Sequence, residues 1–374
     1  MKKNKLRIFT ALILIIFVSF IAFYAGHFLF EEKEAGKPFV LQNSKKSQSP
    51  VLHKHISTTI RGLKQDINIL EVDLSDDRVS ISPVLSFDSI FGYEKLSSMA
   101  SRKGAYAAVN AGFFYEYGRP GGLVCIGGRL LSGSTGIFPV LMVKQGRAHL
   151  SQVKTELWVT SGKKKMMLHS INMPGNAGDS VLYTPEYGKE NRVEGKNISV
   201  TIKDNIIRDI SLFMGSTDIP KDGMLITLFG YTTKDFESFP FAEGDRVEFS
   251  YKPDVGSEAY ECGSWVVRDG KTVIADRDPW VGTLTNREPR TAVGIKGDGK
   301  VVLVTVDGRQ PGHSAGMTGR ELGEFLVGYG VRSAAMLDGG ASTEMIVENK
   351  LLNRPSDRGE ERLLGGGIII KLIK

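Results

Sequence analysis

Residues 301–309 read VVLVTVDGR and residues 334–340 read AAMLDGG, so two short apolar runs each end at an Asp-Gly pair. Apolar runs that are rich in Val and lack polar alternation are typical of strands covered on both faces. Each aspartate therefore follows the carboxyl end of a predicted strand. The chain between the two runs predicts how these strands are related.

The intervening chain has the pattern of an amphipathic helix. Thr318 and Glu321 have the spacing of a capping box, in which each side chain satisfies a free backbone N–H of the other residue. The apolar residues that follow recur at helical spacing and form one stripe: Leu322, Phe325, Leu326 and Tyr329. Gly330 is suited to end the helix in a left-handed conformation.

A strand, a helix and a second strand in this order predict a β-α-β unit with parallel strands. Parallel strands end at the same edge, so we expect Asp307 and Asp338 together at the edge where open α/β sheets bind ligands. A third apolar run, residues 105–109, leads to Asn110 and is expected to end there too. The alternative is that each Asp-Gly pair is only a turn, since this dipeptide is common in turns.

The remaining chain predicts many strands and few helices. Runs such as 197–202, 223–229 and 246–251 have strand composition and are bounded by Gly and Asp turns. We therefore predict a mixed α and β (α+β) fold: a strand-rich domain with a mixed sheet, whose β-α-β unit carries the site at the carboxyl-terminal tips of its strands.

The N-terminal segment predicts a membrane anchor. Residues 8–30 contain no Asp, Glu, Lys or Arg and are long enough to cross a hydrocarbon core of about 30 Å. Basic residues precede this segment and acidic residues follow it, which places residues 1–7 in the cytoplasm. We expect a single-pass cell-membrane protein with a linker over residues 31–55 and an extracytoplasmic domain over residues 56–374. A cleaved signal peptide is the alternative.

Composition excludes some classes of function. The net charge of +6 is modest, and the basic N-terminal residues supply much of it, so nucleic-acid binding is not predicted. The six histidines show no HxxxH or HExxH spacing, which argues against a zinc site. Cys125 and Cys262 are the two cysteines, and they are expected either as a disulfide or as separate buried thiols.

Five segments in order carry a family resemblance. They are residues 110–114 (NAGFF), 290–295 (RTAVGI), 306–309 (VDGR), 316–322 (GMTGREL) and 337–343 (LDGGAST). Together they make the chain resemble the phosphodiester glycosidase family from about residue 60 to residue 373. The resemblance implies a hydrolase that cleaves the glycosidic C1–O bond of a sugar, of N-acetylglucosamine type, from a phosphodiester in a cell-surface glycan, glycolipid or polymer.

Such chemistry usually needs two carboxylates. They lie about 5 Å apart when one is the nucleophile and about 6.5–9.5 Å apart when one activates water. Asp307 and Asp338 are the predicted catalytic pair. Neighbouring strands are about 4.8 Å apart and an intervening strand roughly doubles that distance, so the sequence leaves retention and inversion open. His313, in the loop after Asp307, is a candidate proton carrier.

Predicted phosphate ligands surround these carboxylates. Arg290 and Arg309 suit the anion because a guanidinium group donates a bidentate fork to phosphate oxygens. Gly339 and Gly340 allow backbone N–H groups to approach an anion, and Ser342 adds a hydroxyl donor.

The predicted sugar ligands are Phe113, by stacking, and Asn110, by hydrogen bonds to hydroxyl groups. A core position for Phe113 and a turn role for Asn110 are the alternatives.

Two other functions stay open at this stage. Asp307, Asp338 and Asn110 offer the oxygen ligands that calcium and magnesium prefer, so a divalent-metal phosphodiesterase is one alternative, although no cofactor is expected to be required. The other is a non-catalytic module that binds wall glycans.

Overall fold

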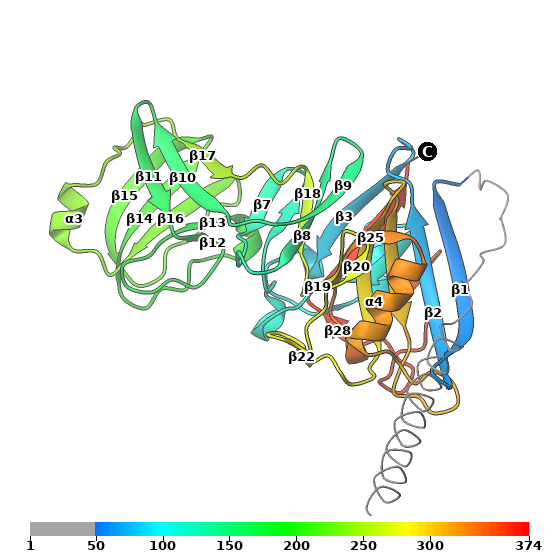
Figure 1. Cartoon of the computed structure of the whole chain (residues 1–374). Helices are drawn as coiled ribbons and strands as arrows, with labels where there is room; N and C mark the ends of the chain where they lie inside the picture. The colour runs from blue at the N-terminus through cyan, green and yellow to red at the C-terminus, as the bar shows by residue number, and fades with distance from the viewer. Residues whose placement is uncertain (1–48, 374) are drawn as a thin grey trace, which may run out of the picture. The chain divides into compact units, whose positions relative to one another are not determined.

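The computed structural model describes residues 49–373, and strands dominate this part of the chain (Figure 1). Its α-helices are short: α2 (Leu96–Arg102), α3 (Thr233–Glu237) and α4 (Gly319–Gly328). The helix predicted from the capping box is α4. Thr318 Oγ1 accepts from the Glu321 N–H at 3.1 Å, and Glu321 Oε2 accepts from the Thr318 N–H at 3.0 Å.

The largest sheet has seven strands in the order β1-β2-β24-β23-β25-β19-β20. Every pairing in it is antiparallel. The strands are β1 (Val51–Ile60), β2 (Leu63–Val72), β24 (Val301–Val306), β23 (Arg290–Lys296), β25 (Val331–Met336), β19 (Trp265–Arg268) and β20 (Lys271–Thr272). β1 begins inside the predicted linker of residues 31–55 and pairs with β2 along its whole length.

This sheet contradicts the predicted fold class. β24 and β25 run in the same direction, but they are not hydrogen-bonded neighbours, because β23 lies between them and is antiparallel to both. The mixed α and β fold with a mixed sheet and a β-α-β unit is therefore wrong, and the molecule is built mainly from antiparallel sheets. The prediction failed because strands covered on both faces were taken as parallel. Here a second sheet, rather than a layer of helices, covers one face.

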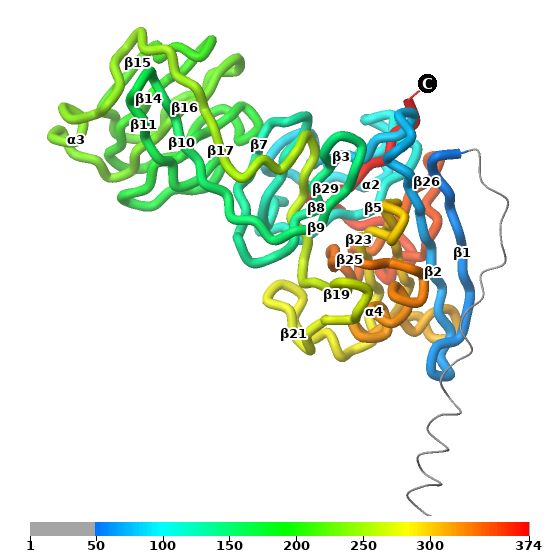
Figure 2. The backbone as a smooth tube through the Cα atoms, turned by 45° about the horizontal axis from the view of Figure 1, so that its top comes forward, coloured from blue at the N-terminus to red at the C-terminus, as the bar shows by residue number. Residues whose placement is uncertain are grey.

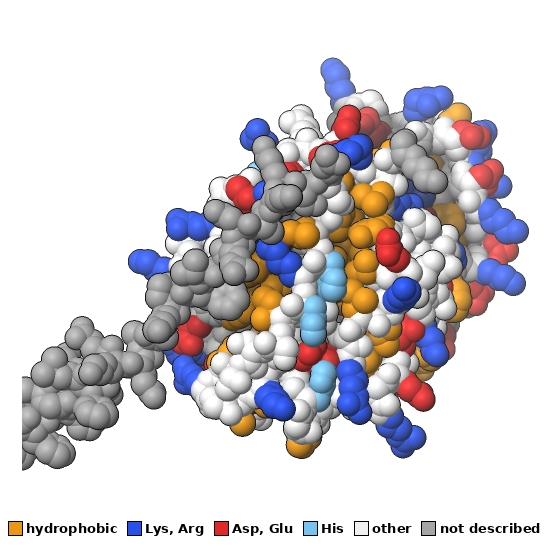
Figure 3. Space-filling model, turned by 90° about the vertical axis from the view of Figure 1, so that its right-hand side faces the viewer, with side chains coloured by type: hydrophobic (Ala, Val, Ile, Leu, Met, Phe, Trp, Pro, Cys, Tyr) orange, Lys and Arg blue, Asp and Glu red, His pale blue; other side chains and the backbone are white. Residues whose placement is uncertain are grey.

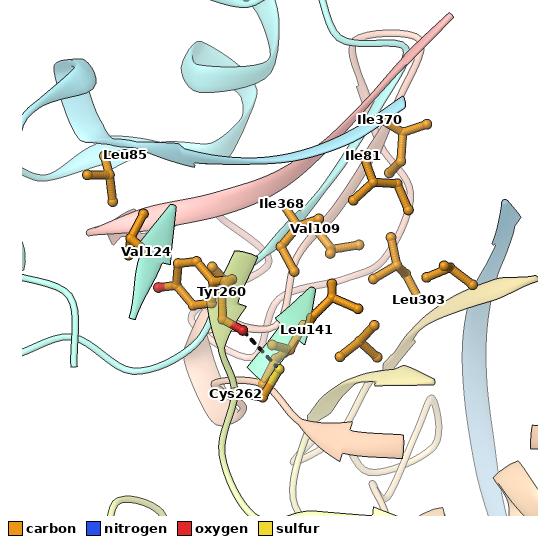
Figure 4. Packing of buried hydrophobic residues seen from close by; sticks show 14 of the residues in the cluster. Ile81, Leu85, Val109, Val124, Leu141, Tyr260, Cys262, Leu303, Ile368 and Ile370 are labelled. Atoms are coloured by element: carbon orange, nitrogen blue, oxygen red, sulfur yellow. Dashed lines mark hydrogen bonds between the residues drawn. The ribbon is translucent and has the colours of Figure 1, made fainter. Parts of the chain in front are cut away.

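The second sheet has five strands in the order β27-β26-β5-β29-β3. They are β27 (Lys350–Leu351), β26 (Met345–Val347), β5 (Ala107–Asn110), β29 (Gly366–Leu372) and β3 (Val79–Leu85). Side chains from both sheets share one buried cluster, in which Leu303 of β24 lies with Val109 and Ile368 (Figure 4).

Helices cover the outer faces of both sheets. Leu322 and Leu326 of α4 pack on the seven-stranded sheet, and Figure 2 shows α4 beside β25. Leu96 and Met99 of α2 pack on the five-stranded sheet. The strands β5, β24 and β25 are therefore buried on both sides, and their polar ends are held in fixed positions.

A third sheet, in the order β7-β6-β18-β8-β9, joins this core to the next one. Its strands are β7 (Arg129–Ser132), β6 (Val124–Ile126), β18 (Glu258–Glu261), β8 (Pro139–Lys144) and β9 (Arg147–Gln152). Alternate residues face different clusters: Leu141 and Tyr260 face the first core, whereas Met142 and Ala259 face the second.

The second core is formed with two further sheets, β11-β10-β17 and β12-β13-β16-β14-β15. Their strands are β11 (Lys164–Leu168), β10 (Glu156–Ser161), β17 (Glu248–Lys252), β12 (Ser170–Ile171), β13 (Ser180–Tyr183), β16 (Gly223–Phe229), β14 (Lys196–Lys203) and β15 (Ile206–Met214). The short β21 (Arg277–Asp278) and β22 (Gly282–Thr283) form a hairpin, and β28 (Leu363–Leu364) pairs with β4 (Glu94–Lys95).

Cys125 and Cys262 are free, buried thiols, so of the two outcomes expected for them the structure has the separate thiols. The Cys262 thiol donates to the Tyr260 carbonyl oxygen at 3.7 Å. Figure 4 marks this hydrogen bond with a dashed line.

The predicted single-pass membrane localisation is contradicted. Over residues 49–373 no helix is long and apolar enough to cross a bilayer. The segment on which the prediction rested, residues 8–30, lies outside the described residues.

Candidate active site

A cleft of about 490 Å³ opens where β23 begins and β25 ends. Charged and aromatic side chains line it, among them Phe113, Trp280, Glu288, Arg290, Arg309 and Asp338. Of the side chains predicted for the site, the structure therefore brings Phe113, Arg290, Arg309 and Asp338 together in one cleft, along with Gly339 and Gly340.

Arg290 is the most unusual of these residues, because it is 1% exposed and forms no ion pair with any carboxylate of the described chain. Its Nε donates to the Met317 carbonyl oxygen at 2.9 Å and its Nη2 to that of Asn286 at 2.8 Å. Burial lowers the pKa of Arg290 to about 10. The charge of Glu288 opposes this lowering of the pKa, and that of Arg309 adds to it. A buried cation that no carboxylate contacts is costly, so this end of the cleft is suited to an anionic ligand.

Two more arginines border the same cleft. Arg309 adopts a left-handed conformation with φ of 60°, and its Nε forms an ion pair with Glu288. Its Nη groups lie over Gly340, where an added Cβ atom would stand 3.3 Å from Nη2. Arg362 also lines the cleft, and its charge lowers the pKa of Asp338. Guanidinium groups therefore approach the cleft from separate segments of the chain.

Asp338 is a titratable carboxyl group of the cleft that burial perturbs. Desolvation raises the pKa of its carboxyl group to about 6, against the opposing effects of Ser342, Arg362 and the Gly339 N–H group. The Asp338 N–H donates to the Ala111 carbonyl oxygen at 3.0 Å, which fixes the backbone at this point. Asp338 thus changes charge near pH 6, in the range that suits a general acid or base.

Asn110 supports Asp338 from behind instead of lining the cleft. Its Nδ2 donates to the Asp338 carbonyl oxygen at 2.6 Å. Its Oδ1 accepts from Thr291 Oγ1 at 2.8 Å and from the Glu344 N–H at 3.2 Å. The side chain is 1% exposed, so its hydrogen-bonding groups serve the protein itself.

The glycines after Asp338 permit a close approach of two chain segments. The Gly340 N–H donates to the Pro289 carbonyl oxygen at 2.9 Å, and a Cβ atom on Gly339 would lie 2.8 Å from that same oxygen. Ser342 follows in a short 3-10 turn and is 1% exposed, and its Oγ has no hydrogen-bond partner among residues 49–373. Gly339 and Gly340 therefore bring Asp338 beside the start of β23.

Asp307 lies on the opposite face of the sheet from Asp338. Residues alternate along β24, and Val301 and Leu303 face the core between the two sheets, so Asp307 continues that face. Met336 faces the helix-covered side, as does Ala292 opposite it. Asp338 and Arg290, each two residues further along, continue this second face, which agrees with their place in the cleft. The predicted pair of carboxylates thus shares a sheet edge but not a face.

Asp307 has its own buried surroundings. His313 Nε2 lies 2.8 Å from its Oδ2, Asn353 Nδ2 donates to Oδ1 at 3.0 Å, and the Arg354 N–H donates to Oδ2 at 2.9 Å. Burial raises the pKa of Asp307, these hydrogen bonds oppose that rise, and the nearby Asp66 adds to it.

Carboxylate and imidazole groups therefore meet on this face. Ligand atoms of Asp66, Asp307 and His313 lie within 4.8 Å of one another. The oxygen set of Asp307, Asp338 and Asn110 for calcium or magnesium stays a prediction. His55 on β1 also contacts Asp66, and Figure 3 shows histidine side chains in a row on one face of the molecule.

Sequence reasoning missed several residues of the cleft. Trp280 packs against Phe113 with ring centroids 5.1 Å apart and against Phe138 at 4.2 Å. Asp278 holds the turn that presents it, since Asp278 Oδ1 accepts from the Trp280 N–H at 2.7 Å. The sequence signal that could have identified Trp280 is a tryptophan within a polar Asp-Pro-Trp turn. Glu288 stood just before the quoted segment 290–295, Arg362 stood beside no quoted segment, and neither had a pattern of its own.

The fold and the cleft together define a strand-rich protein in which arginines suited to an anion lie in one cleft with a titratable carboxyl group. Residues 196–371 match the family model described as phosphodiester glycosidase. This match confirms the resemblance found in the motifs, and the chain carries a phosphodiester glycosidase-type domain over these residues.

Curated relatives are themselves uncharacterised. The SPbeta prophage-derived protein YomE of Bacillus subtilis is 38% identical over 104 residues, which cover 28% of this chain and 16% of that protein. A Rickettsia conorii protein is 25% identical over 226 residues, which cover 56% of this chain and 77% of that one. The chain therefore spans only a small part of the first of these relatives.

Among solved structures, a hypothetical protein from Synechocystis superposes with a TM-score of 0.71 at 19% identity. The superposition covers 86% of this chain and 62% of that one. This likeness shows a shared fold.

Proposed function

We propose that this protein hydrolyses the C1–O bond between a sugar and a phosphodiester, releasing the free sugar and a phosphate monoester. The observation that carries the proposal is Arg290, a buried guanidinium group without a carboxylate partner in the described chain, in the same cleft as Asp338. The phosphodiester glycosidase-type domain gives the reaction class.

The arginines fit the leaving group. A phosphate monoester is a weak base, so the reaction needs charge stabilisation more than it needs strong protonation of the leaving oxygen. Arg290, Arg309 and Arg362 border the cleft and supply positive charge where the departing phosphate gains negative charge. Asp338, with its pKa raised to about 6, is suited to donate a proton to the bridging oxygen.

The aromatic residues of the cleft suit a sugar. Phe113 and Trp280 present aromatic surface beside Asp338, and sugar rings pack their C–H groups on such surfaces. The family resemblance favours a sugar of N-acetylglucosamine type. A substrate in which this sugar is joined by a phosphodiester to a glycan or polymer matches both the arginines and the aromatic residues of the cleft.

The test uses the full chain with a methyl diester of N-acetylglucosamine 1-phosphate and with UDP-N-acetylglucosamine, and separates free sugar from sugar phosphate. We expect free sugar from the wild type and a loss of at least about 100-fold in Asp338→Asn, because a positioned acid contributes about that much or more. Glu324→Gln is the matched control, since Glu324 is exposed and pairs with Arg61 away from the cleft. No free sugar from either substrate or from a wider phosphodiester panel would refute the proposal.

A metal-dependent phosphodiesterase that cleaves P–O is the second candidate. The Asp66, Asp307 and His313 group favours it. Sugar phosphate as the product, with oxygen-18 from water in the phosphate and loss of activity in chelator, would support this candidate over C1–O cleavage.

A further inference from the structure

We propose that Glu288, and not Asp307, is the second catalytic carboxylate of the cleft and acts as the base that activates water for an inverting hydrolysis. This inference rests on the proposed function and names a residue and a stereochemical course for it. It starts from the finding that Asp307 lies on the other face of the sheet, whereas Glu288 lines the same cleft as Asp338.

The backbone pairing places Glu288 near Asp338 at one edge of the sheet. Ala292 pairs with Met336, and the Leu337 N–H donates to the Thr291 carbonyl oxygen, so Asp338 stands opposite Arg290. Glu288 is two residues before Arg290, outside β23, and its side chain lines the same cleft as that of Asp338. Glu288 and Asp338 are therefore not directly opposite each other, and this offset suits an inverting hydrolysis, in which a water molecule lies between two carboxyl groups about 6.5–9.5 Å apart.

The surroundings of Glu288 hold its side chain in place. Its carboxylate forms an ion pair with Arg309 Nε. Its backbone is held by reciprocal hydrogen bonds with Met317, at 3.2 and 3.1 Å. Gly308 and Gly316 let this segment pass closely, since a Cβ atom on either glycine would lie within 3 Å of the Glu288 backbone.

The two carboxyl groups then have different tasks. Glu288 takes a proton from water as the water oxygen forms its bond to C1. The C1–O bond to phosphate breaks, its electron pair goes to the phosphate oxygen, and Asp338 supplies a proton there. The products are the sugar with inverted configuration at C1 and the phosphate monoester, with Glu288 protonated and Asp338 ionised until solvent resets both.

The test combines Glu288→Ala with sodium azide, a small anion that replaces activated water. We expect kcat to fall by at least about 100-fold in Glu288→Ala. Azide should restore turnover at least about tenfold and yield a glycosyl azide of inverted configuration, whereas the matched Glu324→Gln variant should keep wild-type kcat. A Glu288→Ala variant with wild-type kcat, a product of retained configuration, or a loss of activity that azide does not restore in a folded variant would each overturn the inference.

Failure of this inference is distinguishable from failure of the proposed function. If the wild type releases free sugar while Glu288→Ala keeps its kcat, only the role of Glu288 is wrong. If the wild type releases no free sugar, the reaction itself is wrong. Competition by methyl phosphate measures whether Glu288→Ala still binds the anion, and thermal melting shows whether it is folded.

Discussion

At the scale of single residues, the buried charge of Arg290 is better explained by ligand binding than by a contribution to folding stability. Arg290 is buried, and carbonyl oxygens are its hydrogen-bond partners in place of carboxylates. Replacing a buried charge by an apolar group of similar size is often neutral or stabilising. The two carbonyl hydrogen bonds oppose this gain by about 1 kcal/mol each.

We therefore predict that Arg290→Met changes the unfolding free energy by no more than about 2 kcal/mol but removes binding of phosphate esters. Denaturant unfolding and calorimetric titration with methyl phosphate measure the two effects. Arg290→Lys is the informative companion, because it keeps the charge and loses the planar fork. Unchanged methyl phosphate affinity in Arg290→Met would show that this side chain does not hold the anion.

At the scale of secondary-structure elements, α4 was predicted correctly because the signals that form it are local. Thr318 and Glu321 are three residues apart, and the apolar stripe that follows lies within one short helix. Local signals of this kind do not predict the order of the strands in the sheet. Residues 290–296 precede both Val301–Val306 and Ala334–Leu337 in the chain, and no local pattern indicates that they form the strand between them.

The candidate site was predictable to a similar extent. Asp338, Arg290, Arg309 and Phe113 belong to quoted motifs and meet in the cleft. Asp307 and Asp338 lie at the same edge of the sheet, as predicted, but on opposite faces. Side chains alternate between the two faces at every residue of a strand, so the face of each aspartate depends on the strand register, which the sequence does not give.

The capping box allows a direct prediction at this scale. In Thr318→Ala the Glu321 N–H loses its acceptor, and an N-cap change of this kind costs about 1 kcal/mol. Chemical denaturation should report that loss. Thr318→Ser retains the hydroxyl group and should unfold close to the wild-type midpoint, so an equal loss in both variants would assign the effect to packing of the methyl group instead.

At the scale of the whole molecule, the buried carboxyl groups set how stability depends on pH. Burial raises the pKa of Asp338 to about 6 and that of Glu344, which is 0% exposed, to about 8. It also raises the pKa values of Glu258, Glu261 and Asp307. Asp76 and Asp88 have lowered pKa values at more exposed ion pairs, and such pairs contribute little to stability. The buried Glu71 also has a lowered pKa, because it pairs with Lys54 and Lys296, and the stability that it contributes is lost only below about pH 5.

The sign of the dependence follows from proton counting. Between the ordinary pKa of about 4.3 and the raised folded value, the unfolded chain has released its protons from these groups while the folded chain still holds them. The folded state then binds more protons, so the free energy of unfolding falls as pH rises. Glu344 extends this fall to about pH 8, and one of its oxygens, Oε2, has no hydrogen-bond partner in the described part of the chain.

We predict that the protein is more stable at pH 5 than at pH 8, and that Glu344→Gln removes much of the difference because Gln does not ionise. In the wild type, Glu344 Oε1 accepts a hydrogen bond from the Arg362 N–H at 2.8 Å. The amide oxygen of the Gln side chain can still accept this hydrogen bond. Urea unfolding of both proteins at pH 5 and pH 8 gives the four free energies needed. The effect should appear at pH 8, where Glu344→Gln gains stability relative to wild type, and should be small at pH 5. A wild type whose stability rises over this interval would mean that the exposed ion pairs, and not the buried carboxyl groups, dominate the titration of the fold.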